Sequence, residues 1–434
     1  MSLRPRTPGR EAEDVAGLSP DGWLASLDPL GWRFGLERIT ALLAALDGPQ
    51  LSFESIHVVG TNGKSSVTTM TAALLEAAGR TTGAYLSPHS ERWAERVRLR
   101  GAEIDAAAFE RAVDTVAAAV PAVEKSFEED ERVTQFEAAT AAAFVALRDA
   151  GVEVGVIEAG LGGRLDATNV LDSRVTVLTS IGLDHTQWLG ESELEIAGEK
   201  LAVLRPGTTL VLGDLSPDVE AHAREFAAKR NSRVVDALHR GQTSHDVPHG
   251  VHIGTFRSPA PYLRRNLAVA IAGAEAFLGA PLGDEVVPRA LESLELPGRF
   301  EVRDGDPPVI RDAAHNPDGA AALAEALRDE MGATPVVACL AILGDKDAAG
   351  IVQALAPAIT AAVVTEIPPE RLEGAGRPGT SSVGALELAR LCESQGVAAE
   401  VVEGPAEAIT RALKRARDKK GVALIAGSHY LLSY

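Results

Sequence analysis

The segment Ile56-His-Val-Val-Gly-Thr-Asn-Gly-Lys-Ser-Ser-Val67 decides the fold. A run rich in β-branched residues leads into a turn with two glycines, and a helix-like run follows. Backbone N–H groups at a helix N-terminus surround phosphate oxygens, a lysine reaches the outer oxygens, and a hydroxyl approaches a magnesium ion. The segment therefore predicts a phosphate-binding loop made of Gly60, Thr61, Asn62, Gly63, Lys64, Ser65 and Ser66. Position 58 is valine where the full pattern has glycine, so a plain strand–turn–helix connection stays the alternative.

Composition limits the class of protein. The chain has 434 residues, of which 46% are hydrophobic, so it is long enough for a large core and for two domains. The formal net charge of −19 excludes a general nucleic-acid-binding surface, because binding to a phosphate backbone needs a strongly positive patch. Anionic substrates are therefore expected to bind through local lysines, arginines and metal ions. The acidity itself indicates solubility or a salty cytoplasm.

Cysteine usage and hydropathy predict a cytoplasmic protein that does not bind membranes. Cys339 and Cys392 are the only cysteines, and we expect both to be reduced core thiols rather than a disulfide or a metal pair. The longest apolar stretches, such as residues 138–147, are short and alanine-rich, so no membrane span is expected. Met1 to Arg10 contains basic residues without a following apolar signal core.

Strand-like runs alternate with amphipathic helical runs, which is typical of an α/β fold with parallel sheets. The clearest strand-like runs are residues 152–158, 175–180, 209–213, 309–312, 336–343, 361–366 and 422–427. A helix-like run stops at Pro297-Gly298, and a new strand–helix series begins after residues 304–308. The sequence therefore predicts two domains, residues 1–297 and residues 298–434.

Three strand-like runs end in polar loops. Residues 158–169 read Glu-Ala-Gly-Leu-Gly-Gly-Arg-Leu-Asp-Ala-Thr-Asn, residues 179–190 contain Asp184 and His185, and residues 309–317 contain Asp312 and His315. In open α/β sheets such loops lie at the carboxyl edge, where ligands bind. A tight surface loop is the alternative for the first, and a hydrogen-bonded structural histidine is the alternative for the second. Because the third loop belongs to the second predicted domain, we expect a cleft between the domains.

The chain is similar to a known family over nearly its whole length. The motifs that carry the similarity occur in the family's order and spacing: Gly60-Thr-Asn-Gly-Lys64, Leu86-Ser-Pro-His89, Glu95-Arg-Val-Arg98, Thr134-Gln-Phe-Glu137, Gly160-Leu-Gly-Gly-Arg-Leu-Asp-Ala-Thr-Asn169, Asp184-His185, Glu199-Lys200, Arg265-Asn266, Pro297-Gly-Arg299, Asp312-Ala-Ala-His-Asn-Pro317 and Gly344-Asp-Lys-Asp347. They resemble the folylpolyglutamate synthase and dihydrofolate synthase family, within the Mur ligase superfamily of ATP-dependent amide-forming enzymes. The resemblance implies an N-terminal P-loop ATPase-type domain with a parallel sheet, and a smaller C-terminal Rossmann-like α/β domain.

The resemblance also implies a reaction. Family members use ATP to form an acyl phosphate on the carboxylate of a pteroate or folate, and the amine of L-glutamate then displaces phosphate. A carboxylate is a poor electrophile at neutral pH, so phosphorylation makes amide formation possible. The transferring phosphoryl group spreads negative charge over its oxygens, so catalysis needs cations and positioned donors. The implied partners are ATP, a pteroate or folate, and L-glutamate, and the implied oligomeric state is a monomer.

Carried over residue by residue, the resemblance implies catalytic roles for Lys64, Lys200 and His185. It places Ser87, Glu137 and His185 on Mg²⁺, for which hard oxygen ligands are suited. Lys200 is similar to the superfamily's carbamylated lysine, whose new carboxylate would hold a second Mg²⁺. An ordinary helical lysine paired with a nearby acid is the alternative for this residue.

Other residues are implied to contact ATP or the acceptor. The resemblance places Asn266 and Arg299 on the nucleotide, with Arg299 facing phosphate, whose oxygens its planar guanidinium suits. Asp312 and His315 are placed on the ribose or base side of the nucleotide. The implied contacts of the acceptor and of glutamate are Asp166, Ala167, Arg38 and Ser428.

Two departures from the family pattern keep other functions open. Ser65 stands where the family commonly has glycine, and His429 is unusual after Ser428. A Mur-type amide ligase with a non-folate acceptor is therefore one alternative. An ATP-binding regulatory protein without ligase chemistry is a second alternative, although such a protein would not need the predicted metal-binding side chains.

Overall fold

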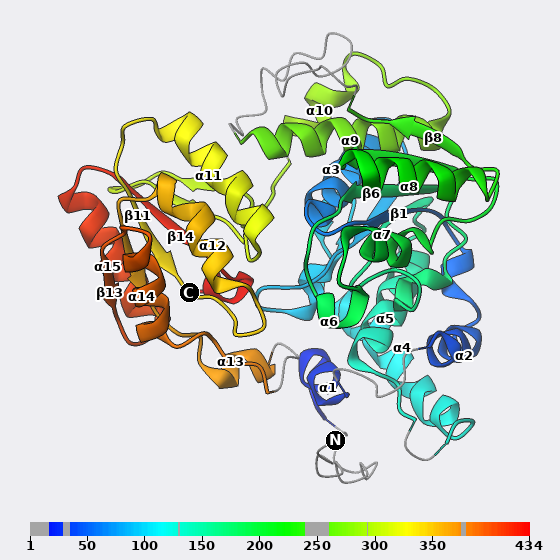
Figure 1. Ribbon diagram of the computed structural model, residues 1–434. Helices are drawn as coiled ribbons and strands as arrows, with labels where there is room; N and C mark the ends of the chain where they lie inside the picture. The colour runs from blue at the N-terminus through cyan, green and yellow to red at the C-terminus, as the bar shows by residue number, and fades with distance from the viewer. Residues whose placement is uncertain (1–16, 29–34, 129–130, 239–259, 293, 375–378) are drawn as a thin grey trace.

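The computed structural model describes residues 17–28, 35–128, 131–238, 260–292, 294–374 and 379–434. Two α/β halves lie side by side (Figure 1), the first built around an eight-stranded sheet and the second around a six-stranded sheet. The predicted absence of a signal core concerns Met1 to Arg10, which lies outside the described residues. No helix in the described part of the chain is long and apolar enough to cross a membrane.

The first sheet is centred on β1 (Glu54–Val59), which pairs in parallel with β5 (Val154–Glu158) and β6 (Val175–Ser180). The strand order is β4-β3-β2-β5-β1-β6-β7-β8, and pairing is parallel except where β3 joins β2 and β4. Strands of this kind are covered on both faces and read as continuous apolar runs, which explains why the sequence marks them clearly. The other strands are β2 (Thr82–Tyr85), β3 (Val97–Leu99), β4 (Ala102–Glu103), β7 (Thr209–Asp214) and β8 (Arg233–Asp236).

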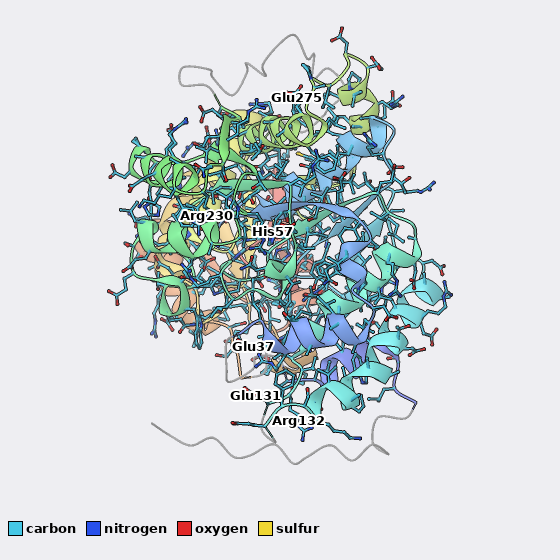
Figure 2. The ribbon with its side chains drawn as sticks, turned by 90° about the vertical axis from the view of Figure 1, so that its right-hand side faces the viewer. Glu37, His57, Glu131, Arg132, Arg230 and Glu275 are labelled. Atoms are coloured by element: carbon cyan, nitrogen blue, oxygen red, sulfur yellow. The ribbon has the colours of Figure 1, made fainter. Side chains whose placement is uncertain are left out.

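Helices cover both faces of this sheet. Ile56 and Val58 of β1 belong to the core with α3, α9 and α10, whereas Val59 belongs to the core with α7 and α8. A third core, around Tyr85 and Phe144, joins α1, α2, α4 and α5. His57 of β1, labelled in Figure 2, is fully buried. The helices are α1 (Pro20–Ser26), α2 (Glu37–Ala45), α3 (Lys64–Ala77), α4 (Ala106–Glu124), α5 (Gln135–Asp149), α6 (Thr186–Leu189), α7 (Glu193–Leu201), α8 (Pro217–Ala228), α9 (Pro261–Leu278) and α10 (Val286–Glu292).

The second sheet has the strand order β13-β12-β11-β14-β10-β9, and only β9 pairs in the antiparallel sense. Helices α11, α12 and α14 pack on one face, and α15 packs on the other. The elements are β9 (Glu301–Arg303), β10 (Val309–Arg311), α11 (Pro317–Met331), β11 (Val336–Leu340), α12 (Ala348–Leu355), β12 (Ala361–Val364), α13 (Pro369–Gly374), α14 (Ala385–Ser394), β13 (Ala399–Val401), α15 (Pro405–Asp418) and β14 (Val422–Ala426).

The predicted α/β class with parallel sheets is confirmed. All seven strand-like runs predicted from the sequence become strands, with ends that differ by a few residues. The largest difference is the run 336–343, because β11 ends at Leu340 and the chain continues as a buried loop toward Gly344. Cys339 and Cys392 are buried free thiols, as predicted. The boundary predicted at residues 297 and 298 falls between α10 and β9, and its use as a domain limit stays a prediction.

Candidate active site

The phosphate-binding loop predicted from the sequence lies between β1 and α3. Gly60 and Gly63 both have positive φ, 151° and 82°. A Cβ atom at position 60 would lie 2.0 Å from Thr179 Oγ1, and one at position 63 would lie 2.7 Å from Asn266 Oδ1. Glycine is therefore needed at both positions, for the backbone conformation and for the close approach of neighbouring atoms. The turn places the N-terminus of α3, with its unpaired N–H groups, on the wall of a cavity.

A buried charged cluster lies beside this turn. Ser65 Oγ donates to Glu158 Oε1 over 3.0 Å, and the Ser87 N–H donates to Glu158 Oε2 over 3.1 Å. Lys64 Nζ donates to the Thr61 carbonyl over 3.1 Å. Burial lowers the pKa of Lys64 and raises the pKa of Glu158, and the attraction between the two charges opposes both shifts. A cation and a carboxylate are thus held together where β5 ends.

A cavity of about 730 Å³ lies between the phosphate-binding loop, α9 and α11. Its size is within the usual range for small-molecule sites. It brings together every residue that the sequence predicts to bind ATP, namely Gly60, Thr61, Asn62, Gly63, Lys64, Ser65, Ser66, Asn266, Arg299, Asp312 and His315. The predicted catalytic residues Lys200 and His185 line the same cavity. We call it the nucleotide cavity.

The second half of the molecule closes the nucleotide cavity. Asn316, the N-cap residue of α11, exchanges two hydrogen bonds with Asn62, at 3.0 and 3.2 Å. Arg299 Nη2 lies 3.5 Å from Ser65 Oγ and 3.4 Å from His429 Nε2. The guanidinium of Arg299 therefore faces the phosphate-binding loop from the other half.

Asp312 and His315 are fixed by hydrogen bonds at the end of β10. Asp312 accepts from the Tyr262 hydroxyl at 2.6 Å and from two backbone N–H groups at 2.8 Å, and burial raises its pKa. His315 Nδ1 donates to the Ala313 carbonyl over 2.9 Å, since a carbonyl only accepts. Burial, and then the positive charge of Lys346, lowers the pKa of His315 to about 4. His315 is therefore a neutral imidazole whose Nε2 is an acceptor.

Lys346 reaches from the second half to the loop that follows β6. Its Nζ lies 2.7 Å from Asp184 Oδ1 and 3.3 Å from His185 Nε2, and its side chain is only 5% exposed. Burial alone would raise the pKa of Asp184, but the positive charges of His185 and Lys346 outweigh it and lower that pKa. The contact ties the two halves together next to the predicted catalytic histidine.

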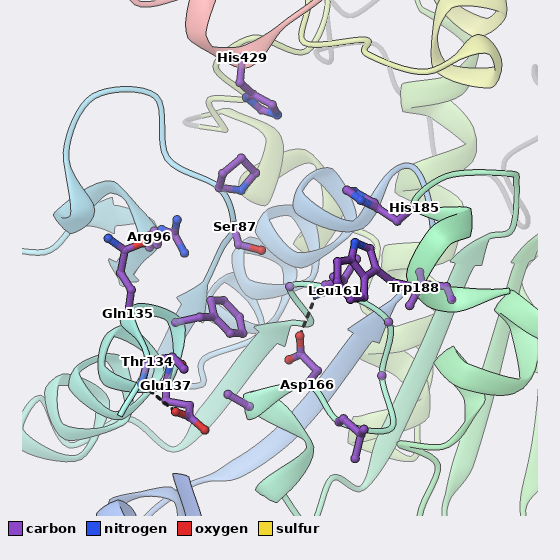
Figure 3. Close-up of a pocket in the computed structure, with 18 of the residues that line it drawn as sticks. Ser87, Arg96, Thr134, Gln135, Glu137, Leu161, Asp166, His185, Trp188 and His429 are labelled. Atoms are coloured by element: carbon purple, nitrogen blue, oxygen red, sulfur yellow. Dashed lines mark hydrogen bonds between the residues drawn. The ribbon is translucent and has the colours of Figure 1, made fainter. Parts of the chain in front are cut away.

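A second cavity, of about 440 Å³, opens beside the first (Figure 3). Its lining includes the four residues that the sequence predicts to contact the acceptor or glutamate, Arg38, Asp166, Ala167 and Ser428. Much of the remaining wall is aromatic or aliphatic, from Trp93, Phe136, Leu161, Leu165, Trp188, Leu189 and Tyr430. The aromatic part of this wall suits a flat aromatic ligand, and the polar side chains around it can fix the orientation of such a ligand. We call it the aromatic cavity.

Arg96 is a buried cation in the wall of the aromatic cavity. Its guanidinium lies 4.2 Å from the centre of the Trp93 ring, and its Nε donates to His89 Nδ1 over 2.9 Å. No ion pair of Arg96 with a carboxylate is found within the described part of the chain. The sequence motif that contains Arg96 contributed to the family resemblance, but the residue was not predicted as a site residue.

Glu137 lines the aromatic cavity, as do Ser87 and His185, but it does not line the nucleotide cavity with them. It is the third residue of α5, and its carboxylate turns back to accept from the N-cap N–H at 2.8 Å and to pair with Arg38 Nε at 3.2 Å. Figure 3 shows Glu137 and His185 on opposite sides of the aromatic cavity. The nucleotide cavity is lined by Glu158 and not by Glu137. The carboxylate that accepts from the Ser87 N–H is Glu158, whereas a capping role holds Glu137 at its own helix. The predicted place of Glu137 in the metal set stays a prediction.

Lys200 lies on α7 and is 5% exposed. Burial, and then repulsion from Lys64, lowers the pKa of Lys200 to about 7. A substantial fraction of this amine is therefore neutral at physiological pH, unlike an ordinary lysine, whose pKa is about 10.4. The alternative of a helical lysine paired with an acid finds no ion pair to support it among the described residues.

The two cavities share one wall. It consists of Ser87, Pro88, Gly160, Leu161, His185, Leu189, His315 and His429. Three groups in or beside this wall escaped the sequence prediction: Glu158, Lys346 and Arg96. A signal for Glu158 was available, since a single acid that ends a buried apolar strand before a glycine-rich loop needs a charged partner.

Within the described part of the chain, protein side chains alone do not build a complete metal site. Among the described residues, no group of three His, Cys, Asp or Glu side chains is arranged to hold a metal ion. Glu158, the Ser87 hydroxyl and His185 line the nucleotide cavity together. A short protein ligand set of this kind fits Mg²⁺, which usually keeps several waters and takes its other ligands from substrate phosphates.

Comparison with known proteins agrees with this architecture. The family model described as "Mur ligase, glutamate ligase domain" matches residues 298–429. Dihydrofolate synthase/folylpolyglutamate synthase of Mycobacterium tuberculosis is 35% identical over 389 residues, which are 82% of this chain and 77% of the relative. Folylpolyglutamate synthase of Lacticaseibacillus casei is 34% identical, with 78% of this chain and 83% of the relative covered. The fold and the site thus define a two-domain ligase of the Mur type.

Solved structures give the same result. Mycobacterium tuberculosis folylpolyglutamate synthase complexed with ADP matches with a TM-score of 0.82 and 30% identity, covering 92% of this chain and 94% of that one. A bifunctional folylpolyglutamate synthase/dihydrofolate synthase with Mn, AMPPNP and L-glutamate bound matches with a TM-score of 0.79 and 31% identity, covering 96% and 97%. The chain belongs to the folylpolyglutamate synthase and dihydrofolate synthase family, and the family prediction is confirmed.

Proposed function

We propose that this chain is an ATP-dependent ligase that joins L-glutamate to dihydropteroate, to reduced folates, or to both, through an acyl phosphate. The observation that carries the proposal is the wall shared by the nucleotide cavity and the aromatic cavity. At this wall, the carboxylate of an acceptor in the aromatic cavity would meet the γ-phosphate of a nucleoside triphosphate in the nucleotide cavity. Direct transfer of a phosphoryl group needs this meeting of the two substrates.

Residues of the two cavities would bind different parts of the substrates. Lys64, Arg299 and the N-terminus of α3 would hold the phosphates, and their positive charge would stabilise the charge that spreads over the phosphoryl oxygens. Aromatic side chains would hold the ring system of the acceptor, with Arg96 as the buried cation nearby. Ser428, which lines the aromatic cavity, would accept from the ammonium group of L-glutamate, whereas His315 would stay at the nucleotide.

The residues that would hold Mg²⁺ are Ser87, Glu158 and His185. We place Glu158 in this set instead of Glu137, because Glu158 accepts from the Ser87 N–H whereas Glu137 pairs with Arg38. When bound, the ion would neutralise charge on the phosphate oxygens. In the protein, Ser65 and the Ser87 N–H hold the Glu158 carboxylate in a fixed orientation toward the cavity.

Carbamylation of Lys200 is part of the proposal, as the source of a ligand for a second Mg²⁺. The neutral amine would attack the carbon of carbon dioxide, a C–N bond would form, and one N–H proton would leave to water. Its support is the burial of Lys200 and its lowered pKa. Carbon-13 NMR with labelled bicarbonate would detect the carbamate, and Lys200→Ala serves as the control. The absence of a Lys200-dependent carbamate signal in active protein would refute it.

Release of inorganic phosphate tests the proposed function. We expect release from ATP only when L-glutamate is present together with dihydropteroate or a reduced folate. Separate assays with each acceptor decide between one activity and two. Turnover with a UDP-linked sugar peptide would assign the chain to a different Mur-type acceptor. Absence of turnover with every acceptor, in protein that binds ADP, would favour the regulatory alternative.

A further inference from the structure

His57 is a fully buried histidine on the central strand β1, three positions before the phosphate-binding loop begins (Figure 2). Its Nε2 lies 2.8 Å from the Oγ1 of Thr168, in the 3₁₀ turn Ala167–Val170. Neither His57 nor Thr168 lines the nucleotide cavity or the aromatic cavity. Their contact nevertheless joins β1, which leads into the phosphate-binding loop, to the end of the loop formed by residues 160–169.

The direction of these hydrogen bonds follows from the donors available. The Thr168 hydroxyl donates its single hydrogen to Asp166 Oδ1, so the oxygen of that hydroxyl accepts from His57 Nε2–H. The hydrogen of His57 is therefore on Nε2. Its Nδ1 is buried and has no hydrogen-bond partner among the described residues. Burial, and then the positive charge of Arg205, lowers the pKa of His57 to about 3, which favours the neutral ring.

Asp166 extends this chain of hydrogen bonds to the start of the loop formed by residues 160–169, which we call the glycine-rich loop. Its Oδ1 also accepts from the Thr168 N–H at 3.0 Å, and its Oδ2 accepts from the Leu161 N–H at 2.8 Å, the bond drawn in Figure 3. Leu161 belongs to the wall that the two cavities share. A continuous chain of hydrogen bonds thus connects β1 to the loop against which both substrates would lie.

We propose that His57 is a positioning residue that sets the glycine-rich loop relative to the phosphate-binding loop, through Thr168 and Asp166. This inference rests on the proposed function and names a residue for it that touches neither cavity. Because β1 leads directly into the phosphate-binding loop, the chain fixes how closely an acceptor carboxylate can approach the nucleotide. Errors of about 1 Å in such an approach cost on the order of 100-fold in rate.

Four variants in two matched pairs test the chain of hydrogen bonds. Thr168→Val keeps the shape of the side chain and removes the hydroxyl, whereas Thr168→Ser keeps the hydroxyl. His57→Leu removes the Nε2–H donor, whereas His57→Gln places an amide donor near the same point. Thr176→Val is the control, because Thr176 pairs in register with His57 on β6 and its buried hydroxyl has no partner among the described residues.

The kinetic readout separates positioning from a general loss of structure. We expect Thr168→Val and His57→Leu to raise the KM for the acceptor or lower kcat by about 10-fold or more, with the affinity for ADP within twofold of the unchanged protein. Thr168→Ser, His57→Gln and Thr176→Val should stay near the unchanged protein in all three values. Unchanged acceptor kinetics in Thr168→Val, or an equal loss of ADP affinity, would overturn the inference.

Amide hydrogen exchange gives an answer that does not depend on turnover. The Leu161 N–H, which donates to Asp166, should lose protection in Thr168→Val and keep it in Thr168→Ser and Thr176→Val. If the unchanged protein has no ligase activity, the proposed function fails, and the exchange of Leu161 still decides whether the chain of hydrogen bonds holds the loop. Equal protection of Leu161 in all variants would refute that role.

Discussion

Gly63 and Gly79 both adopt left-handed backbone conformations, with φ of 82° and 90°, and only Gly63 faces the nucleotide cavity. A Cβ atom at Gly79 would meet nothing within 4 Å, whereas one at Gly63 would contact Asn266. We expect Gly79→Ala to lose about 1 kcal/mol of the free energy of unfolding from backbone strain. Gly63→Ala should lose more, because its Cβ atom would also displace Asn266. Only Gly63→Ala should weaken ADP binding, by about 10-fold or more in calorimetry. Equal ADP affinity of the two variants would contradict the assignment of this loop.

The two candidate carboxylates, Glu158 and Glu137, can be distinguished by parallel substitutions. Glu158→Gln keeps the size of the side chain but removes the charge beside Lys64, so turnover should fall by about 100-fold or more even at high Mg²⁺ concentration. Glu137→Gln breaks a buried pair with Arg38 and should mainly reduce the free energy of unfolding, by about 3 kcal/mol. Steady-state kinetics and urea unfolding measure both effects. A larger loss of turnover in Glu137→Gln would restore the metal set predicted from the sequence.

At the scale of single elements, α7 carries Lys200 and packs against the glycine-rich loop. The Arg164 N–H donates to the Glu199 carbonyl of this helix over 3.0 Å. Ser192 and Glu195 form a capping box at the N-terminus of α7, far along the helix from Lys200. The cap thus contributes to helix stability without touching the nucleotide cavity.

Loss of this cap should affect stability rather than substrate binding. Ser192→Ala should lower the free energy of unfolding by about 1 kcal/mol, because one N–H group at the helix start loses its acceptor. Ser192→Asp should restore most of that loss, since aspartate caps helices equally well. Urea unfolding gives the free energies, and KM values for ATP and the acceptor should be unchanged. A changed KM in Ser192→Ala would mean that the cap also orients the site.

The sequence predicted the elements better than it predicted the side-chain partners. β1 and β6 are buried on both faces, so their apolar runs were visible, and residues 175–180 match β6 without error. The positions of the site residues followed from strand ends, because parallel strands deliver their loops to one edge of a sheet. The partners of Glu137, its N-cap N–H and Arg38, were not predicted, because a motif does not reveal which way a side chain turns at a helix N-terminus. Lys346 escaped because its partner, Asp184, comes from the other half of the molecule.

At the scale of the whole molecule, Lys346 forms a buried ion pair between the two halves. Its buried ammonium pairs with Asp184 beside His185, while a second contact, from Arg371 Nη2 to the Ser90 carbonyl at 3.0 Å, lies at another point between the halves. Removing the Lys346 charge leaves the buried carboxylate of Asp184 without that partner. Such losses cost about 3 kcal/mol or more.

Lys346→Met should therefore lower stability and turnover together, and it should increase the radius of gyration measured by small-angle scattering as the halves separate. Arg371→Ala is the matched control, since it removes a contact between the halves that does not involve the shared wall of the cavities. We expect this control to keep turnover within about threefold, as is usual for partly exposed contacts. An unchanged radius of gyration with full activity in Lys346→Met would argue against the role of Lys346 in closing the site.

The strand order has a consequence for how the protein is made. β1, at residues 54–59, needs β5 and β6 on its two sides, and these strands begin only at Val154 and Val175. Ribosomes add about 5–20 residues per second, so the nascent β1 lacks both neighbours for on the order of ten seconds. The second sheet waits for a similar time, because β10 ends at Arg311 and its parallel neighbour β14 begins only at Val422. Chaperones that hold unpaired apolar strands should therefore associate with the growing chain until its last strand is released.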